Sequence, residues 1–345
     1  MYTKPEASLI PLPWQLPAWR QLHVRLNNST LPHALLISGV AGTGKLHFAQ
    51  AFAALALCRQ PESTHACGQC GACRQLAASA HPDFYRVAIA EDKSGILVDQ
   101  IRELSQKLAL TSQHSGWKIA VVAPADAMNA NAANSLLKTL EEPSAATLLL
   151  LVTARPARLP ATIRSRCQAV RINTPSTDTA VTWLNENTSR LDWPALLRIA
   201  GGGPLLALEL ANDELMQSRL DFYKMLMEMN SGRRNPISCA SEAGKENLPL
   251  VLRLLQAWTS DLITIASTGN PLEPGIINAD ALVMLQNALM GINLRGLHAF
   301  LSRINEAIAL TTTSVNGQLL LEGLFMDWSE GLRTLETAPL AARGG

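Results

Sequence analysis

Short apolar runs alternate with helix-forming segments over the first half of the chain. Residues 33–39, HALLISG, form an apolar run that ends in glycine, and residues 46–58 then favour a helix. Further strands are predicted at residues 83–89, 118–123, 147–154 and 167–172. Strands that are apolar over nearly their whole length and alternate with helices are typical of a parallel sheet covered on both faces. We therefore predict an α/β fold with a five-stranded parallel sheet for residues 1–173.

The pattern changes after residue 173. The segment NTPSTD has the composition of a linker, and residues 174–212 are predicted to form a small helical domain. Residues 213–345 show helical periodicity, and the polar stretch 231–247 within them is expected to be a loop. One apolar stripe consists of Leu250, Val251, Leu254, Leu255, Trp258, Leu262 and Ile265. This spacing is typical of a helix with one buried face, so we predict an all-α C-terminal domain.

Composition and charge narrow the functional class. Hydrophobic residues make up 48% of the 345 residues, as in ordinary globular proteins. The formal net charge of +1 argues against a protein that binds nucleic acid or membranes by charge alone. The first residues lack the basic segment and apolar run of a secretion signal, and TLLLLVTA is far shorter than the roughly 20 residues that span a bilayer. We expect a soluble, cytoplasmic protein without a membrane partner.

The stretch GVAGTGKL, residues 39–46, matches a phosphate-binding Walker A loop except at its last position. Glycines in such a loop let backbone N–H groups converge on phosphate oxygens, and the lysine neutralises the outer phosphates. The candidate nucleotide-binding residues are Gly39, Gly42, Gly44 and Lys45. Leu46 stands where the motif has Ser or Thr, so no hydroxyl is available for Mg²⁺.

The acidic half of a hydrolytic site is also missing from the sequence. Hydrolysing P-loop proteins place an Asp at the end of a neighbouring strand to position Mg²⁺. Here the strand KIAVV is followed by Ala123 and Pro124, and Asp126 is expected to be a solvated loop residue. We therefore predict that the chain does not hydrolyse ATP by itself. The loop either binds ATP or ADP passively, with weak or magnesium-independent binding, or is empty.

Four cysteines lie close together in the sequence. Cys58, Cys67, Cys70 and Cys73 are spaced as in zinc modules, and four thiolates suit tetrahedral zinc. A shell of four sulfurs leaves no position for water, so the predicted role is structural. The alternative is four reduced thiols without a metal. The nearby His65 and His81 are expected to be bystanders, and Cys167 and Cys239 are expected to be ordinary small residues.

Two further motifs carry a family resemblance. NSLLKTLEEP, an apolar strand and then SRC follow one another between residues 134 and 167. This arrangement closely resembles the bacterial replicative clamp loader of the AAA+ class. The resemblance implies an AAA+ P-loop core with an inserted zinc module over residues 1–173, a helical lid over 174–212 and a helical collar over 213–345.

The same resemblance makes Arg166 of the SRC motif an arginine finger that reaches the nucleotide site of an adjacent subunit. The alternative is an ordinary surface cluster, because several further arginines lie close by in the sequence. These are Arg155, Arg158, Arg164 and Arg171.

The departures from the family pattern imply a particular role. Motor subunits carry Asp-Glu where this chain has Ala123-Pro124, and Leu205 matches the position of their sensor arginine, whereas Thr153 matches a polar sensor that persists. The resemblance therefore implies a stator subunit that is itself non-catalytic, within the DNA polymerase III holoenzyme. Its implied partners are the motor (gamma/tau) and delta subunits, and, through the assembled loader, the sliding clamp and primer-template DNA.

Two alternatives to this role require residues that the chain does not have. A motor-type ATPase subunit of the same loader would need a hydroxyl at position 46 and carboxylates at 123–124. A zinc-dependent nucleic-acid-binding module would need basic and aromatic residues between the cysteines, where CGQCGACRQLAASAH has one arginine and no aromatic residue. Both alternatives are disfavoured by the residues present.

Overall fold

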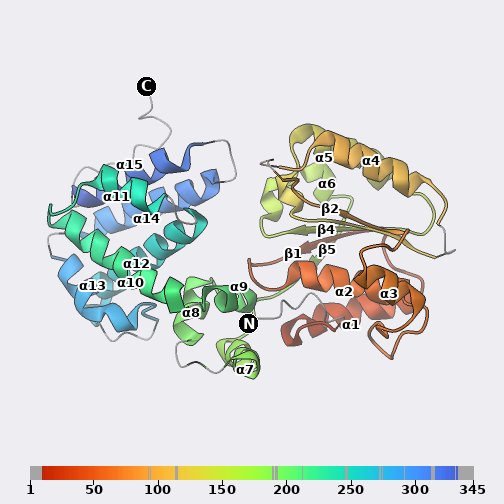
Figure 1. The fold of residues 1–345 in the computed structure, drawn as a ribbon, viewed down its shortest axis with the longest axis horizontal. Coiled ribbons are helices and arrows are strands. Elements are labelled where there is room, and N and C mark those ends of the chain that lie inside the picture. Colours follow the sequence, from red (N-terminus) through yellow and green to blue (C-terminus); the bar gives the residue numbers. More distant parts are fainter. Residues whose placement is uncertain are drawn as a thin grey trace. The chain divides into compact units, whose positions relative to one another are not determined.

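The computed structural model describes two compact units, Met1–Thr182 and Trp183–Gly345 (Figure 1). The residues described are 10–91, 93, 95–112, 116–188, 190, 193–211, 213–244, 248–271, 273, 275–290, 292–311, 315–330 and 332. Helix α7 (Thr177–Asn187) crosses the boundary between the two units. The predicted further division into a lid over residues 174–212 and a collar over 213–345 stays a prediction.

The first unit is built on a five-stranded sheet in the order β2-β3-β4-β1-β5. The strands are β1 (Ala34–Ser38), β2 (Phe84–Val87), β3 (Lys118–Val122), β4 (Thr147–Thr153) and β5 (Gln168–Arg171). All neighbouring pairs are parallel, and the central strands β3 and β4 are buried along their whole length. This confirms the predicted parallel sheet, because strands buried on both faces read as continuous apolar runs.

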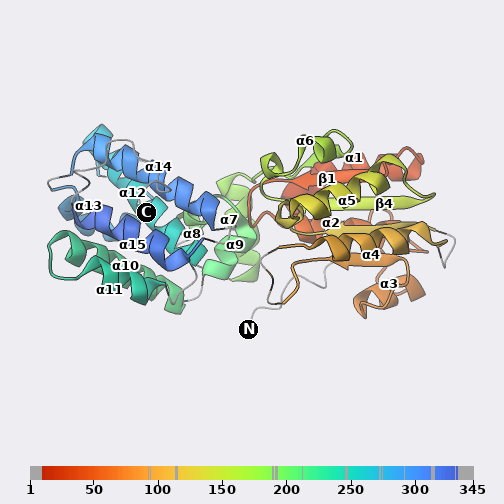
Figure 2. The ribbon, with the colours of Figure 1, turned by 90° about the horizontal axis from the view of Figure 1, so that it is seen from above.

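Helices cover both faces of this sheet (Figure 1). One face carries α1 (Leu16–Asn27), α2 (Lys45–Leu57) and α3 (Gly71–Ala77). The other carries α4 (Val98–Ala109), α5 (Ala130–Glu141) and α6 (Ala161–Arg164), with α4 and α5 packed against each other (Figure 2). The apolar positions of α4 and α5, such as Leu104 and Leu136, are buried against β1, β3 and β4. The helices on the two faces hold the sheet in place, and with it the loops that follow the carboxyl ends of its strands.

The second unit is helical. Its helices are α8 (Trp193–Ile199), α9 (Pro204–Leu210), α10 (Asp213–Asn230), α11 (Pro236–Ala243), α12 (Leu248–Thr268), α13 (Leu282–Ala288), α14 (Leu294–Leu310) and α15 (Gly317–Ser329). Helix α12 packs along α14, and α15 contacts α10, α11 and α14. The predicted stripe on α12 is buried except for the half-buried Leu250. Length and composition alone would let α12 cross a membrane, but Leu255, Trp258 and Leu262 are fully buried within the unit, as in a soluble core helix.

The loop predicted at residues 231–247 is wrong for its middle part. Helix α11 occupies Pro236–Ala243, and Cys239 and Ala240 on it are buried. The side chain of Asn235 caps this helix by accepting hydrogen bonds from the N–H groups of Ile237, at 2.8 Å, and Ser238, at 3.4 Å. An Asn cap followed by Pro at the first helical position is a helix start signal, which outweighs the polar composition. Residues 245–247 of the predicted loop lie outside the described residues.

Gly39 has a packing role that is independent of any ligand. A Cβ atom at this position would lie 2.3 Å from the backbone oxygen of Ile172, whose N–H donates a hydrogen bond to Ser38. Replacing Gly39 with Ala is therefore expected to lower the free energy of unfolding by about 1–3 kcal/mol, since backbone must move to admit the methyl group. Chemical denaturation measures this change. Gly116→Ala is the control, because a Cβ there meets nothing within 4 Å; equal stabilities for the two variants would contradict the prediction.

Candidate functional site

The glycine loop, residues 39–45, connects the end of β1 to the start of α2. Gly42 and Gly44 have φ values of 75° and 76°, in the left-handed region that suits glycine. Gly44 is the N-cap residue of α2, so the free N–H groups of the helix start lie beside the loop. The strand–loop–helix context predicted from the sequence is present, and this arrangement is able to bind an anion.

Lys45 folds back onto the loop. Its ammonium group donates a hydrogen bond of 2.7 Å to the backbone oxygen of Val40, and the residue is 8% exposed. Burial lowers the pKa of Lys45 to about 8, although the negative charge of Asp126 opposes the shift. The lysine charge is therefore held against the backbone of the loop at Val40.

Trp14 and Gln15 hold the glycine loop from outside, a role that no motif in the sequence indicates. Trp14 Nε1 and Gln15 Nε2 each donate a hydrogen bond of 2.9 Å to the carbonyl oxygen of Thr43. Gln15 Nε2 also donates to the carbonyl oxygen of Gly44, at 2.9 Å, and Gln15 is fully buried. Because the N–H and C=O of a trans peptide point in opposite directions, these bonds fix the N–H groups of Gly44 and Lys45 on the other side of the chain.

Asp126 is not the solvated loop residue that the sequence predicted. Its side chain is 3% exposed and forms an ion pair with Arg155, whose Nε lies 3.0 Å from Asp126 Oδ2. Thr153 Oγ1 donates a 2.6 Å hydrogen bond to Asp126 Oδ1. The short 3₁₀ turn Ala125–Ala127 after β3 brings Asp126 next to the end of β4, where Thr153 lies. Asp126 and Thr153 lie far apart in the sequence, and they meet only because β3 and β4 are neighbouring strands.

Arg166 lies just after α6, at a half-exposed position. Its Nη2 lies 2.7 Å from Glu141 Oε1, and its Nη1 donates a 3.0 Å hydrogen bond to the carbonyl oxygen of Thr162. The exposed fractions of the Arg166 and Glu141 side chains are 37% and 49%. Arg155 is not equivalent to it, because Arg155 is paired with the buried carboxylate of Asp126. Leu205, the position matched to a sensor arginine, is a half-buried apolar residue on α9.

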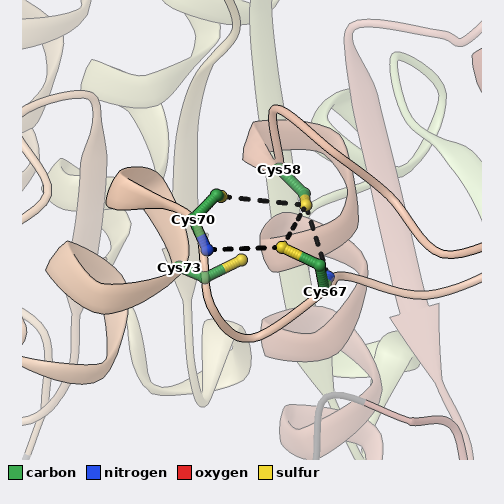
Figure 3. A group of neighbouring side chains, drawn as sticks. All are labelled: Cys58, Cys67, Cys70 and Cys73. Atoms are coloured by element: carbon green, nitrogen blue, oxygen red, sulfur yellow. Dashed lines mark hydrogen bonds between the residues drawn. The ribbon is translucent and has the colours of Figure 1, made fainter.

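The four predicted metal ligands come together in space. The sulfur atoms of Cys58, Cys67, Cys70 and Cys73 all lie within 4.8 Å of one another (Figure 3). Cys58 ends α2, Cys73 lies in α3, and the loop between the two helices supplies Cys67 and Cys70. A tetrahedral zinc ion at Zn–S distances of about 2.3 Å requires sulfurs roughly 3.8 Å apart, and the Cys58–Cys67 and Cys58–Cys70 separations are 3.6 and 4.0 Å.

Backbone N–H groups surround this sulfur cluster. The N–H of Cys67 donates to Cys58 Sγ and the N–H of Cys70 donates to Cys67 Sγ, each at 3.4 Å (Figure 3). Burial raises the pKa of Cys58 and Cys73 and opposes the thiolate of Cys70, but hydrogen bonds from the N–H groups of Cys73 and Arg59 lower the pKa of Cys70 to about 6. Donors of this kind stabilise thiolates, which are the ligands that zinc requires. The donor set therefore fits a zinc ion.

The remaining candidates near the cluster have other contacts. His65 faces Glu62 at 3.5 Å, and the buried His81 accepts a hydrogen bond from the N–H of Asp83. Within the described part of the chain, the four cysteines are the one group of this kind able to hold a metal. Cys167 packs against the core of the sheet and Cys239 is buried, as expected of small apolar residues.

The cysteine loop is tied to α1 and α2 by Trp19. Trp19 Nε1 donates a 2.8 Å hydrogen bond to the carbonyl oxygen of Thr64, which lies between Cys58 and Cys67. The indole ring packs edge-on against Phe48 and Phe52 of α2, at centroid distances of 5.5 and 5.6 Å. Helix α2 thus begins at the glycine loop and ends at the cysteine cluster, with Trp19 packed beside it.

Comparisons with known proteins agree with the motifs. Two protein-family models match: "DNA polymerase III, delta subunit" over residues 14–176 and "DNA polymerase III, delta subunit, C terminal" over residues 213–330. DNA polymerase III subunit delta' of Pseudomonas aeruginosa is 33% identical, over 92% of this chain and 97% of the relative. The subunit of the same name in Escherichia coli K12 is 32% identical, over 91% and 94%. DNA polymerase III subunit tau of Bacillus subtilis is 33% identical over 39% of this chain and 24% of the relative.

Proposed function

Because the chain belongs to the DNA polymerase III delta' subunit family, we propose that it is a non-hydrolysing stator subunit of the replicative clamp loader. The single observation that carries this proposal is that the first unit has a glycine loop without catalytic groups but keeps an accessible arginine elsewhere. The glycine loop is well formed but lacks catalytic groups, while the half-exposed Arg166 lies on a different segment, just after α6. Such a chain contributes to ATP hydrolysis at a neighbouring subunit and not at its own loop.

The chemistry of the glycine loop supports the absence of hydrolysis. Phosphoryl transfer depends on groups that neutralise developing charge and orient the attacking water. The side chain of Leu46 has no oxygen, and the nearby carboxylate of Asp126 already accepts hydrogen bonds from Arg155 and Thr153. A nucleotide would be held by the N–H groups of the loop and by Lys45, so ATP or ADP binding at this loop would be passive.

Arg166 would supply the chemistry in trans. A guanidinium is planar, permanently charged and able to donate two hydrogen bonds to a phosphate. Directed at the γ-phosphate of a neighbouring ATP, it stabilises the charge of the transition state, an effect of roughly 10³–10⁵ in rate in other systems. The neighbour would be a motor (gamma/tau) subunit, and the wider assembly would include the delta subunit, the sliding clamp and primed DNA in the cytoplasm.

The cysteine cluster would hold one structural zinc ion. Cys58, Cys67, Cys70 and Cys73 fill all four positions of a tetrahedral shell, so the ion would have no site for a substrate or water. Its contribution would be to fix the segment between α2 and α3 beside Trp19. The second, helical unit would join the collar of the assembled loader.

Omission of the chain tests this function. The purified chain with ATP and Mg²⁺ should show no turnover above the buffer background. A loader reconstituted from the motor and delta subunits, clamp and primed DNA should hydrolyse ATP and load clamps only when the chain is added. Turnover by the chain alone would identify a motor-type ATPase, and clamp loading at the full rate without the chain would contradict the proposed role.

A further inference from the structure

We propose that Glu141 is a restraining residue that holds Arg166 on its own subunit until a neighbouring nucleotide displaces it. This inference rests on the proposed function, because it assigns a role to Glu141 only if Arg166 acts in trans. Beyond that function, the inference says that Glu141 sets how easily Arg166 binds the ATP of a neighbouring subunit.

The contacts of Arg166 show a side chain folded back on its own subunit. Both terminal nitrogens of its guanidinium are in use: Nη2 at 2.7 Å from Glu141 Oε1, and Nη1 at 3.0 Å from the carbonyl oxygen of Thr162. Thr162 belongs to α6, the helix just before Arg166, so the side chain curls over its own preceding turn. An arginine that reaches another subunit must release at least one of these contacts.

The position of Glu141 at the end of a helix makes pairing of its carboxylate with a cation favourable. Glu141 is the last residue of α5, and the carboxyl end of a helix carries a partial negative charge. A carboxylate there is disfavoured unless a positive group lies close to it, and Arg166 is that group. Neutralising Glu141 removes this unfavourable term, so the substitution should be tolerated by the fold.

The restraint must be weak enough for ATP to overcome. Ion pairs between partly exposed side chains contribute at most about 1 kcal/mol, which corresponds to roughly a fivefold change in an equilibrium. A γ-phosphate carries more negative charge than a carboxylate and competes successfully for the guanidinium. The apparent affinity for ATP is then the intrinsic affinity multiplied by the fraction of Arg166 that is unrestrained, whereas the rate at saturating ATP is unaffected.

Glu141→Gln in the reconstituted loader tests the restraint. The KM for ATP should fall about two- to fivefold at low salt, with kcat unchanged, because a neutral amide no longer holds the guanidinium. The difference from wild type should shrink at high salt, since the ion pair of the wild type is then screened. Glu142→Gln is the matched control, because Glu142 has the same charge and forms no ion pair with any described residue.

Arg166→Ala and the double variant with Glu141→Gln separate the two proposals. If Arg166→Ala alone leaves turnover unchanged, the trans role of Arg166 fails. If Arg166→Ala lowers turnover but Glu141→Gln has the KM of wild type or a higher one, the restraint alone fails. A KM decrease that persists in the double variant, or that Glu142→Gln reproduces, would also overturn it, because the effect would then not pass through Arg166.

Discussion

Replacing Cys73 with Ala is expected to release the metal and to unfold the segment between α2 and α3. The apolar contacts that hold this segment are small: the buried cluster contains Ala54, Ala66 and Cys73. Burying three such side chains contributes only a few kcal/mol, less than the conformational entropy of ordering the loop. A structural zinc ion held by the four cysteines would therefore supply most of the stability of the segment, and its loss should cost about 3 kcal/mol or more locally.

Metal content and hydrogen exchange together measure this effect. The wild-type chain should hold about one zinc ion, as four-cysteine structural sites do, and its amides between Cys58 and Cys73 should exchange slowly. Cys73→Ala, or treatment with a chelator, should abolish both. Cys167→Ala is the matched control, because Cys167 is a half-buried cysteine outside the cluster. The Cys167→Ala chain should bind as much zinc as the wild type. Slow exchange in a metal-free wild-type chain would contradict the assigned structural role.

The sheet could be predicted from the sequence because its signal is local. The strands β1, β3 and β4 are nearly continuous apolar runs, and burial on both faces of a parallel sheet produces that pattern. The cysteine cluster could be predicted equally well, since four cysteines within sixteen residues have the spacing of a zinc module. Helix α11 is hidden by the polar composition of its segment, in which only Asn235-Pro236 marks a helix start.

The contacts that shape the candidate site could not be predicted from the sequence. Asp126 follows β3 and becomes buried only because β4 places Thr153 and Arg155 beside it. Gln15 reads as an ordinary polar residue, yet it is fully buried against the carbonyl oxygens of the glycine loop. Such pairings join segments far apart along the chain, and a single sequence carries no periodic signal for them.

Arg166→Ala is expected to lower ATP turnover by the assembled loader by a factor of about 10² or more, given the contribution of arginine fingers elsewhere. The loss should appear in the rate at saturating ATP, because the guanidinium stabilises charge that develops in the transition state. Arg166→Lys should recover little of the rate, since an ammonium keeps the charge but lacks the planar pair of donors.

Arg164→Ala is the control for this experiment. Arg164 is an exposed arginine at the end of α6, two positions before Arg166, and its removal changes the net charge by the same amount. It should leave turnover close to wild type if position, and not charge alone, determines the effect. Size-exclusion chromatography of each reconstituted complex shows whether assembly is intact.

The most direct measurement is therefore ATP turnover by the reconstituted loader containing wild-type, Arg166→Ala or Arg164→Ala chains, with clamp and primed DNA present. A large loss for Arg166→Ala alone, in a fully assembled complex, is the result expected of a subunit that completes its neighbour's active site. Equal turnover for all three chains would contradict that claim and leave the chain a structural member of the loader.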